Sequence, residues 1–329
     1  MTDPADPPVG DLAESTILRA ILDVVGTAEA AEVGPGDDAA VLRAPDGRVV
    51  ATTDTLVHGP DFRLAWSSGF DLGWKAAAVN LADVAAMGAR PTALLVALAM
   101  PSDTRLSFVR ELARGLAVAC TALAPGCAVV GGDLTVSPTL TVAVTALGSL
   151  EGRTPVLRSG ARAGDVVALA GRAGVAGHGI DLLFARFTDA AGPVAVDHSG
   201  LDATELEALD AQLRPTPPIG LGVVAAAAGA TAMMDVSDGL ALDAARLAAA
   251  SGVTVALRSA GVGGDARWAI DGGEDHALLA TFPSAADIPS GFRVIGEVMP
   301  AGEHSLLVDG AAREPRGWDP YRDWDAGIG

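Results

Sequence analysis

Apolar segments of helix length alternate with apolar segments of strand length along this 329-residue chain. The spacing of apolar residues predicts helices over residues 72–87 and 106–123, and a buried strand between them at 92–100. The same alternation returns later, where a strand at 232–236 leads into a helix over 240–250. Alternating elements of this kind must pack as layers, so we expect an α/β (α+β) fold.

The composition changes near residue 150. Residues 151–164 are rich in Gly, Arg and Pro, and a new strand is expected to begin at residue 165. We therefore predict an N-terminal domain over 11–150 and a C-terminal domain over 151–329. The Pro/Asp-rich stretch 1–10 is expected to be disordered.

Charge and hydropathy exclude several classes of function. The formal net charge is −19 and no Lys/Arg cluster is present, which argues against nucleic-acid binding. The longest apolar segments, such as 93–100 and 220–228, are shorter than the ~20 residues of a membrane span, and the acidic N-terminus does not resemble a signal peptide. Two cysteines without metal-site spacing fit a reducing compartment. We expect a cytoplasmic protein with no membrane partner.

Aspartates stand beside Gly, Thr or Ser after several of the apolar runs. The motifs are Gly36-Asp37-Asp38, Thr53-Asp54-Thr55, Gly131-Gly132-Asp133 and Asp235-Val236-Ser237-Asp238-Gly239. We expect each to be a short turn whose backbone N–H groups face a phosphate while the carboxylates bind hard cations. An acidic protein can bind an anionic substrate when divalent cations lie between the two. The motifs therefore predict a site for Mg²⁺ and a nucleotide.

Each motif also has a purely structural explanation. Gly and Asp are common turn residues, and Ser237 or Asp238 could simply cap the helix that follows. The segments 39–42 and 48–53 could form one hairpin around Asp46-Gly47, or each could pair with other strands. The sequence leaves these alternatives open.

Three further side chains are candidates on their own. Asp83 lies on a very apolar predicted helix, where a carboxylate is costly to bury unless it is paired or binds metal, and Asn80 projects from the same side. Glu274, in Gly-Gly-Glu-Asp at 272–275, could anchor a substrate or be a solvated turn residue. Arg158 could bind a phosphate or be a surface charge. The five histidines are scattered and predict neither a zinc site nor a histidine nucleophile.

Taken in order, these motifs resemble the thiamine-monophosphate kinase family over nearly the whole chain. The resemblance is carried by Gly36-Asp37-Asp38-Ala39, Thr53-Asp54-Thr55-Leu56-Val57, residues 79–91, Gly131-Gly132-Asp133, residues 235–240 and Gly272-Gly273-Glu274-Asp275. The shorter Asp motifs are shared with the wider superfamily of aminoimidazole ribonucleotide synthetase, selenophosphate synthetase and HypE. The segment from Asn80 to Pro91, which contains the end of the predicted helix, and the Gly-Gly-Glu-Asp motif point to the kinase.

The resemblance implies ATP-dependent phosphorylation of thiamine monophosphate to thiamine diphosphate, with ADP as the second product. It implies two αβ domains of the aminoimidazole ribonucleotide synthetase type, with mixed sheets flanked by helices, that form a homodimer through the N-terminal domains. By the family's pattern, several Mg²⁺ ions would be held by Asp38, Thr52, Thr53, Asp54, Asp83, Asp133, Asp235 and Asp238. ATP would contact Gly132, Asp133, Arg158 and Ser237. Asp133 and Asp238 are the expected catalytic residues, and Glu274 and Tyr321 would face the thiamine moiety.

Two segments depart from the family's pattern. Asp61-Phe62 stands where the family usually has His-Phe, with His58 three positions earlier, so Asp61 becomes a candidate for substrate binding. Near the C-terminus Pro320-Tyr321 replaces another His-Phe, and Trp324 could take the aromatic role instead.

The expected chemistry fits this set of residues. The nucleophile is a phosphate oxygen that is ionised at neutral pH, so no general base is needed and direct transfer is expected. The alternatives are another ATP-dependent enzyme, such as aminoimidazole ribonucleotide synthetase, and a nucleotide-binding regulator that has lost catalysis. Selenophosphate synthetase and HypE are disfavoured because the chain lacks their terminal reactive cysteines.

Overall fold

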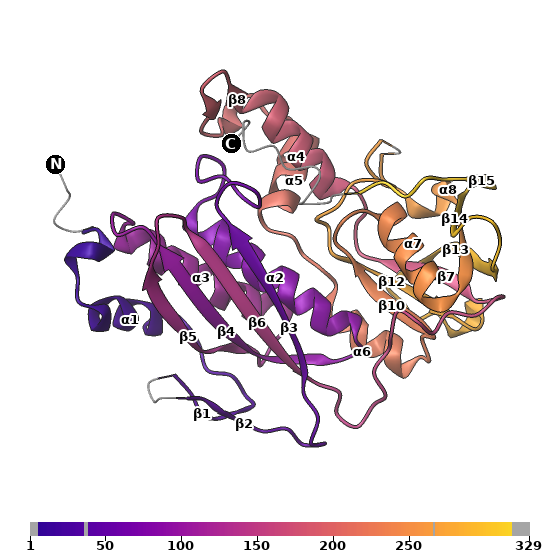
Figure 1. Cartoon of the computed structure of the whole chain (residues 1–329), viewed down its shortest axis with the longest axis horizontal. Helices are drawn as coiled ribbons and strands as arrows, with labels where there is room; N and C mark the ends of the chain where they lie inside the picture. Colours follow the sequence, from indigo (N-terminus) through magenta and orange to yellow (C-terminus); the bar gives the residue numbers. More distant parts are fainter. Residues whose placement is uncertain (1–5, 36–38, 266, 318–329) are drawn as a thin grey trace.

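The structure is a computed structural model that describes residues 6–35, 39–265 and 267–317 (Figure 1). A four-stranded sheet forms the N-terminal half, in the order β3-β6-β4-β5. Its strands are β3 (Val50–Val57), β4 (Arg90–Met100), β5 (Ala128–Val136) and β6 (Thr141–Ser149). Only β4 and β5 are parallel neighbours.

Two helices, α2 (Gly69–Ala86) and α3 (Leu106–Leu123), cover one face of this sheet (Figure 1). α2 begins at a capping box in which Ser68 and Asp71 exchange hydrogen bonds, as a helix N-terminus requires. The two helices approach closely because glycines face the contact: a Cβ on Gly73 would lie 2.0 Å from the Leu112 carbonyl oxygen. α1 (Glu14–Leu22) packs against α3.

The opposite face of the sheet, called the open face below, carries Thr53, Leu95, Asp133 and Thr145. Alternation along each strand separates the two faces. Val142, Val144 and Ala146 of β6 are fully buried against the helices, whereas Thr145 belongs to the other set. Among the described residues, β1 (Ala31–Val33) and β2 (Val41–Leu42) cover one end of the open face, where they pack on Ala93 and Val130.

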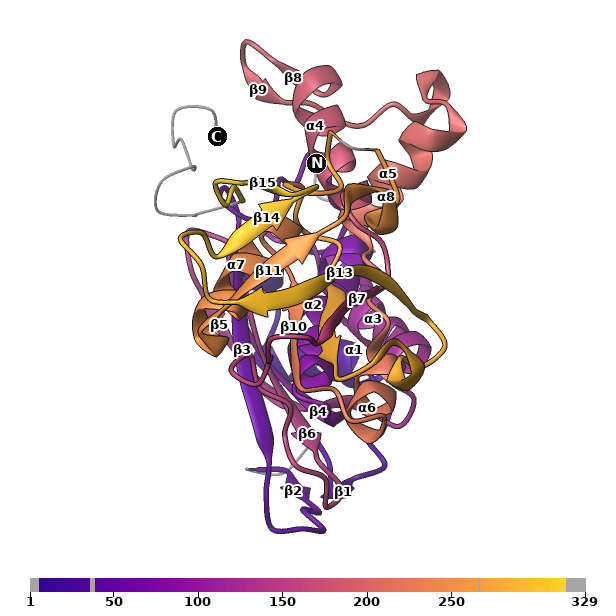
Figure 2. The same ribbon diagram turned by 90° about the vertical axis from the view of Figure 1, so that its right-hand side faces the viewer.

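The C-terminal half contains a seven-stranded sheet in the order β10-β12-β7-β13-β11-β14-β15. The strands are β7 (Val166–Ala170), β10 (Ala232–Val236), β11 (Val253–Leu257), β12 (Ala277–Phe282), β13 (Phe292–Pro300), β14 (Leu306–Val308) and β15 (Ala311–Ala312). All neighbours are antiparallel except β11 and β14. Figure 2 shows β11, β13 and β14 side by side.

Helices connect this second sheet to the first half. α7 (Leu240–Ser251) belongs to the core on one face of the second sheet, and α6 (Ile219–Ala227) to the core on the other. α6 also packs against α2, where a Cβ on Gly222 would lie 2.1 Å from the Ala85 carbonyl oxygen. The contact is so close that only glycine fits. α2 itself also contacts β10, so it lies between the two sheets.

The chain segment that follows β7 and precedes α6 projects from the molecule as an arm (Figure 1). It consists of α4 (Val175–Arg186), β8 (Thr188–Asp189), β9 (Gly192–Pro193) and α5 (Ala203–Leu213). Trp66, from the N-terminal half, packs against Leu183, Phe187 and Leu209 of the arm, and its Nε1 donates to the Phe187 carbonyl oxygen at 3.0 Å. The remaining short elements are η1 (Val9–Asp11), η2 (His198–Gly200), α8 (Ser259–Val262) and η3 (Ala285–Asp287).

The predicted mixed α/β class is confirmed, but several local expectations need correction. Of the two alternatives left open for segments 39–42 and 48–53, pairing with other strands is the one observed, because β2 pairs with β1 while β3 pairs with β6. Thr53-Asp54-Thr55 and Gly131-Gly132-Asp133 are not turns: they lie inside β3 and β5, where ladder hydrogen bonds keep the backbone extended.

Three other expectations concern the limits of the chain. Disorder of residues 1–10 stays a prediction, and of these residues the structure describes 6–10, where Asp6 accepts hydrogen bonds from Ser107 and Val9 is buried. The domain division at residue 150 stays a prediction. Among the described helices, none combines the length and the apolar character that crossing a membrane would require.

Candidate active site

Carboxylates from both halves meet where α2 passes between β3 and β10. Three of the residues predicted to bind metal lie here: Asp54 on β3, Asp83 on α2 and Asp235 on β10. Thr52, two residues from Asp54 on the same face of β3, donates to Asp83 Oδ2 at 2.7 Å. Asn80 fixes the strand against the helix, since its Oδ1 accepts from the Asp54 N–H at 3.0 Å. We call Asp54, Asp83 and Asp235 the cleft carboxylates.

The cleft carboxylates destabilise one another's charged forms. Burial, together with the charges of Asp235 and Asp54, raises the pKa of Asp83 to about 7. Burial also raises the pKa of Asp54, with Asp235, Glu274 and Asp238 contributing in the same direction. Like charges in a low-dielectric site repel strongly. A cation placed among them would remove that repulsion, although no three described side chains already have the geometry of a metal site.

His276 is a buried member of this site that the sequence analysis did not single out. Its Nδ1 lies 3.2 Å from Asp235 Oδ2, and its Nε2 has no partner among the described residues. Burial favours the neutral ring, but Asp235 and Glu274 outweigh it, so the pKa of His276 is higher than usual. Its backbone has a left-handed φ of 51°, which fits a residue held between the turn and β12.

Asp238 stands at the start of α7 but does not cap it. The N-cap residue is Gly239, at φ 123°, and no side chain provides the cap hydrogen bond. Instead, Arg246 Nη1 contacts Asp238 Oδ2 at 2.5 Å and Asp243 Oδ1 at 2.8 Å. The buried Asp243 accepts the Asp238 N–H at 3.0 Å, and burial raises its pKa to about 6. The capping explanation of Ser237 and Asp238 is therefore wrong.

The Gly-Gly-Glu-Asp turn presses against this segment. A Cβ on Gly273 would lie 2.4 Å from the Ser237 carbonyl oxygen, and the Glu274 N–H donates to the same oxygen at 2.7 Å. Glu274 has a left-handed φ of 72°. Its Oε2 lies 2.5 Å from Lys75 Nζ, and although burial raises the pKa of Glu274, Lys75 and His276 lower it more.

Two cavities lie near these residues. One, of about 650 Å³, is lined by aromatic and acidic residues from both halves. Its lining includes Asp61, Lys75, Trp66, Phe184, Trp268, Ser237, Asp238 and Glu274. The other, of about 530 Å³, is lined by Thr52, Asp83, Asp235 and Arg158. Of the cleft carboxylates, Asp83 and Asp235 line the 530 Å³ cavity, whereas the acidic residues of the 650 Å³ cavity include Asp238 and Glu274.

The structure does not bring Thr53 and Asp133 into this group. Strand register places Asp133 opposite Ala97, which pairs with Ala143 and then Thr55, so Asp133 lies on the open face. Three inter-strand steps of about 4.8 Å separate it from β3. A bulge at Val130 sets this orientation, because it shifts the alternation of β5 by one residue. The Thr53 hydroxyl also lies on the open face and donates to the Val144 carbonyl oxygen.

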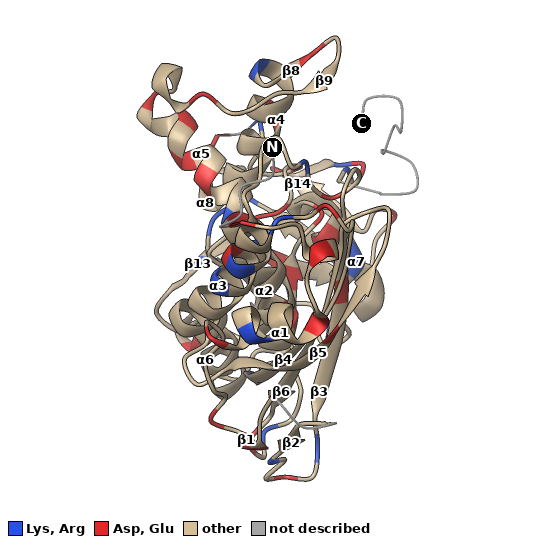
Figure 3. Ribbon diagram, turned by 90° about the vertical axis from the view of Figure 1, so that its left-hand side faces the viewer, with Lys and Arg blue, Asp and Glu red and all other residues tan. Residues whose placement is uncertain are grey.

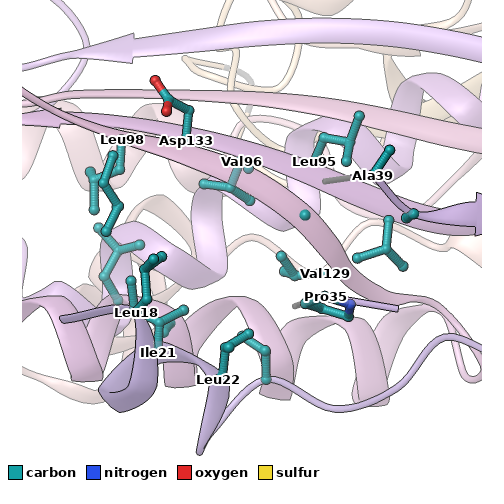
Figure 4. Close-up of a pocket in the computed structure, with 18 of the residues that line it drawn as sticks. Leu18, Ile21, Leu22, Pro35, Ala39, Leu95, Val96, Leu98, Val129 and Asp133 are labelled. Carbon is teal, nitrogen blue, oxygen red and sulfur yellow. The ribbon is translucent and has the colours of Figure 1, made fainter. Parts of the chain in front are cut away.

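Gly132 and Asp133 instead line a third cavity of about 790 Å³ beside α1. Figure 4 shows Asp133 pointing away from the apolar side chains of Leu18 and Ile21 at its base. Three other predicted residues, Asp38, Tyr321 and Trp324, fall outside the described residues.

Several residues of the site were missed from sequence. Lys75, His276 and Arg246 pair with Glu274, Asp235 and Asp238 respectively. Trp66 and Trp268 line the 650 Å³ cavity. Only Lys75 left a signal in the composition: it is the sole lysine among the 22 Lys and Arg residues.

The chain is similar to known proteins over almost its whole length. Residues 36–150 match the family model "AIR synthase related protein, N-terminal domain". Thiamine-monophosphate kinase of Corynebacterium glutamicum is 40% identical, with 97% of this chain and 95% of the relative covered. That of Mycobacterium tuberculosis is also 40% identical, with 89% and 85% covered.

Solved structures of thiamine-monophosphate kinases are also similar to this chain. AaThiL complexed with AMPPCP and TMP has a TM-score of 0.73 at 32% identity, covering 86% of this chain and 90% of that chain. Thiamine-monophosphate kinase from Stenotrophomonas maltophilia has a TM-score of 0.73 at 31% identity, covering 92% and 98%. Escherichia coli HypE, with a TM-score of 0.68 at 17% identity and coverage of 94% and 99%, shares the fold.

Proposed function

Because this chain belongs to the thiamine-monophosphate kinase family, we propose that it phosphorylates thiamine monophosphate with ATP at the cleft carboxylates, by direct transfer. The observation that carries this proposal is the meeting of Asp54, Asp83 and Asp235 at a cavity lined by Asp83 and Asp235. A second cavity is lined by Ser237 and Asp238, which follow Asp235 closely in the sequence. One relative is known in complex with both an ATP analogue and TMP, so the family binds two phosphorylated ligands together.

We assign Mg²⁺ to the cleft carboxylates and Asp238. The donor set fits a hard cation, since it consists of carboxylate and hydroxyl oxygens without thiolates. Burial and then mutual repulsion raise the pKa of Asp83 and Asp54, and a bound divalent cation would relieve the repulsion. When bound, magnesium would neutralise and orient the phosphates. Asp38, Thr53 and Asp133 remain proposed ligands from the family's pattern.

The two cavities suggest where the substrates lie. We place thiamine monophosphate in the 650 Å³ cavity, because Trp66, Phe184 and Trp268 offer aromatic surface and Asp61 and Glu274 offer negative charge to a cationic ring. We place the ATP phosphates towards the 530 Å³ cavity, where Arg158 is available. Tyr321 stays a proposed substrate contact.

The reaction needs positioning rather than acid–base catalysis. The attacking oxygen belongs to the ionised phosphate of thiamine monophosphate, so no side chain has to remove a proton. The chain's task is to hold two polyanions in line and at close range. Ser237 and Asp238 lie between the end of β10 and the start of α7, where the N–H groups at the start of the helix can face a phosphate.

We propose a homodimer formed through the open face. Leu95 on this face is 37% exposed, and β5 has no neighbour on its outer side in the described structure. Joining two such faces would bury apolar surface and cover an unpaired edge. It would also give Gly132 and Asp133 of one chain a route to the site of the other.

The remaining proposals follow from charge and cysteine state. We expect no nucleic-acid partner, since acidic residues predominate over the molecule and strands β4 and β6 are nearly free of charge (Figure 3). We place the enzyme in the cytoplasm, because Cys120 and Cys127 are buried free thiols, as a reducing compartment favours.

The direct test is conversion of thiamine monophosphate to thiamine diphosphate and ADP by purified protein with Mg-ATP, followed by chromatography. We expect product that disappears when a chelator is added. ATP binding without any product would reject the proposal and favour the regulator. ATP hydrolysis coupled only to an amide-type acceptor would favour the synthetase.

A further inference from the structure

Lys75 is an unusual choice of residue at an unusual position. It is the only lysine of a chain that otherwise uses arginine for every such positive charge, and it is 6% exposed. It projects from α2 into the wall of the 650 Å³ cavity. An ammonium is a compact charge whose partners can change, whereas a guanidinium makes a planar two-bond grip on a carboxylate.

The contacts of Lys75 leave one donor available. Its Nζ lies 2.5 Å from Glu274 Oε2. With the Gln212 amide oriented to satisfy both its neighbours, Nζ also donates to the Gln212 oxygen at 3.0 Å. An ammonium has three N–H donors, so a third can be offered to a ligand in the cavity.

Lys75 also stands between the two ends of the cavity. Gln212 belongs to α5, on the side of the arm where Trp66 packs against Leu183 and Leu209. Glu274 is hydrogen-bonded to Ser237, on the side of Asp238 and the cleft carboxylates. A ligand whose ring contacts the aromatic end and whose phosphate reaches the carboxylates must therefore pass Lys75 and Glu274.

We propose that the Lys75–Glu274 ion pair is exchanged for the substrate's own two charges, with Lys75 binding the acceptor phosphate and Glu274 the cationic ring. This inference rests on the proposed function. Thiamine monophosphate carries a positive thiazolium and a negative phosphate, and the pair presents one partner for each. Glu274, whose side chain is 35% exposed, can turn towards a ligand, while the buried Lys75 stays in place. A ligand lacking either charge would leave one member of the pair unmatched.

The test measures binding of two ligands, thiamine and thiamine monophosphate, by calorimetry to the full chain. Lys75→Met should weaken thiamine monophosphate by about 10- to 100-fold while changing thiamine by less than about threefold. Glu274→Gln should weaken both ligands by similar factors, because both contain the ring. Should Lys75→Met alone be unstable, the double variant Lys75→Met/Glu274→Gln can be compared with Glu274→Gln for binding of the same two ligands.

Lys75→Arg separates ligand binding from a structural role. If Lys75 only neutralised Glu274, arginine would rescue affinity for both ligands. Under the exchange, arginine holds Glu274 more firmly, so KM for thiamine monophosphate should stay at least tenfold raised while the melting temperature is unchanged or higher. Arg172→Met, which removes the exposed Arg172–Glu207 pair outside the cavity, is the matched control and should leave both affinities unchanged.

The outcomes distinguish this inference from the proposed function. If the unmodified protein makes no thiamine diphosphate, the proposed function fails. If it does, but Lys75→Met weakens both ligands equally or neither of them, only the exchange is overturned.

Discussion

Asp235 and Asp133 follow apolar runs of similar appearance, yet their surroundings in one chain are opposite. Asp235 ends β10 within a group of buried carboxylates and contacts His276. Asp133 lies inside β5 on the open face of the other sheet, and its side chain points away from the apolar Leu18 and Ile21 (Figure 4). An aspartate motif therefore predicts a carboxylate available for a cation, while the register of its strand decides which site it can reach.

The largest expected effect comes from the cleft. Asp235→Asn should lower turnover by about 10³-fold or more, because a charge that positions and neutralises the reacting phosphates is lost. The variant should nevertheless melt at the same or a higher temperature without Mg²⁺, since one of the charges that repel Asp83 and Asp54 is removed. Thermal melts with and without Mg²⁺ check this, and the rise caused by Mg²⁺ should vanish. Near-normal turnover would remove Asp235 from the metal set.

Asp133→Ala should also abolish most of the turnover, but for a reason that involves the second chain. If Asp133 acts across the dimer, mixing inactive Asp133→Ala chains with inactive Asp235→Asn chains rebuilds one complete site in each mixed dimer. Half of the dimers are mixed and each has one working site, so we expect about a quarter of the wild-type activity. Activity of the co-expressed mixture measures this directly. No recovery in proven mixed dimers would place Asp133 in the site of its own chain, or in none.

The open face itself can be tested with a charge. Leu95→Glu should convert a dimer into monomers, because a carboxylate would have to be buried between two sheets without a partner. Light scattering coupled to gel filtration gives the mass, and turnover should fall with it by about tenfold or more if the site needs both chains. Val118→Glu on α3 is the control, since Val118 is 39% exposed against 37% for Leu95 but lies on the helical layer. Equal behaviour of the two variants would exclude the open face as the interface.

The sequence was most informative where periodicity and local chemistry agree. The helix over 72–87 and the strand at 232–236 were predicted close to their observed bounds, since apolar spacing and flanking Gly residues mark their ends. Asp83 was identified because a charge on so apolar a helix needs a reason to be there. The structure supplies that reason in Thr52 and the neighbouring carboxylates.

Other features depend on long-range pairing, which leaves little trace in one sequence. The hairpin of 39–42 with 48–53 was plausible locally, but β3 pairs with β6, about ninety residues away. The bulge at Val130 turns Asp133 to the open face, and the Gly131-Gly132 sequence did not allow us to predict that bulge. His276 could not be recognised because its partner Asp235 is forty-one residues distant.

The smallest expected effect concerns Asp275, next to Glu274 but directed at the arm. Its Oδ1 accepts the Ala176 N–H at 3.1 Å at the start of α4, while Oδ2 is buried without a partner among the described residues. Burial raises the pKa of Asp275 above its usual value. The folded chain therefore holds this proton to higher pH than the unfolded chain does, and the free energy of unfolding falls as pH rises through that window. Asp275→Asn keeps the acceptor oxygen but cannot ionise, so its stability relative to wild type should improve from pH 4 to pH 7 by on the order of 1 kcal/mol. Urea unfolding at both pH values measures the difference, with Asp287→Asn as the exposed control that should show no such trend. A relative stability that falls with pH would mean that the ionised carboxylate is the form that the start of α4 stabilises.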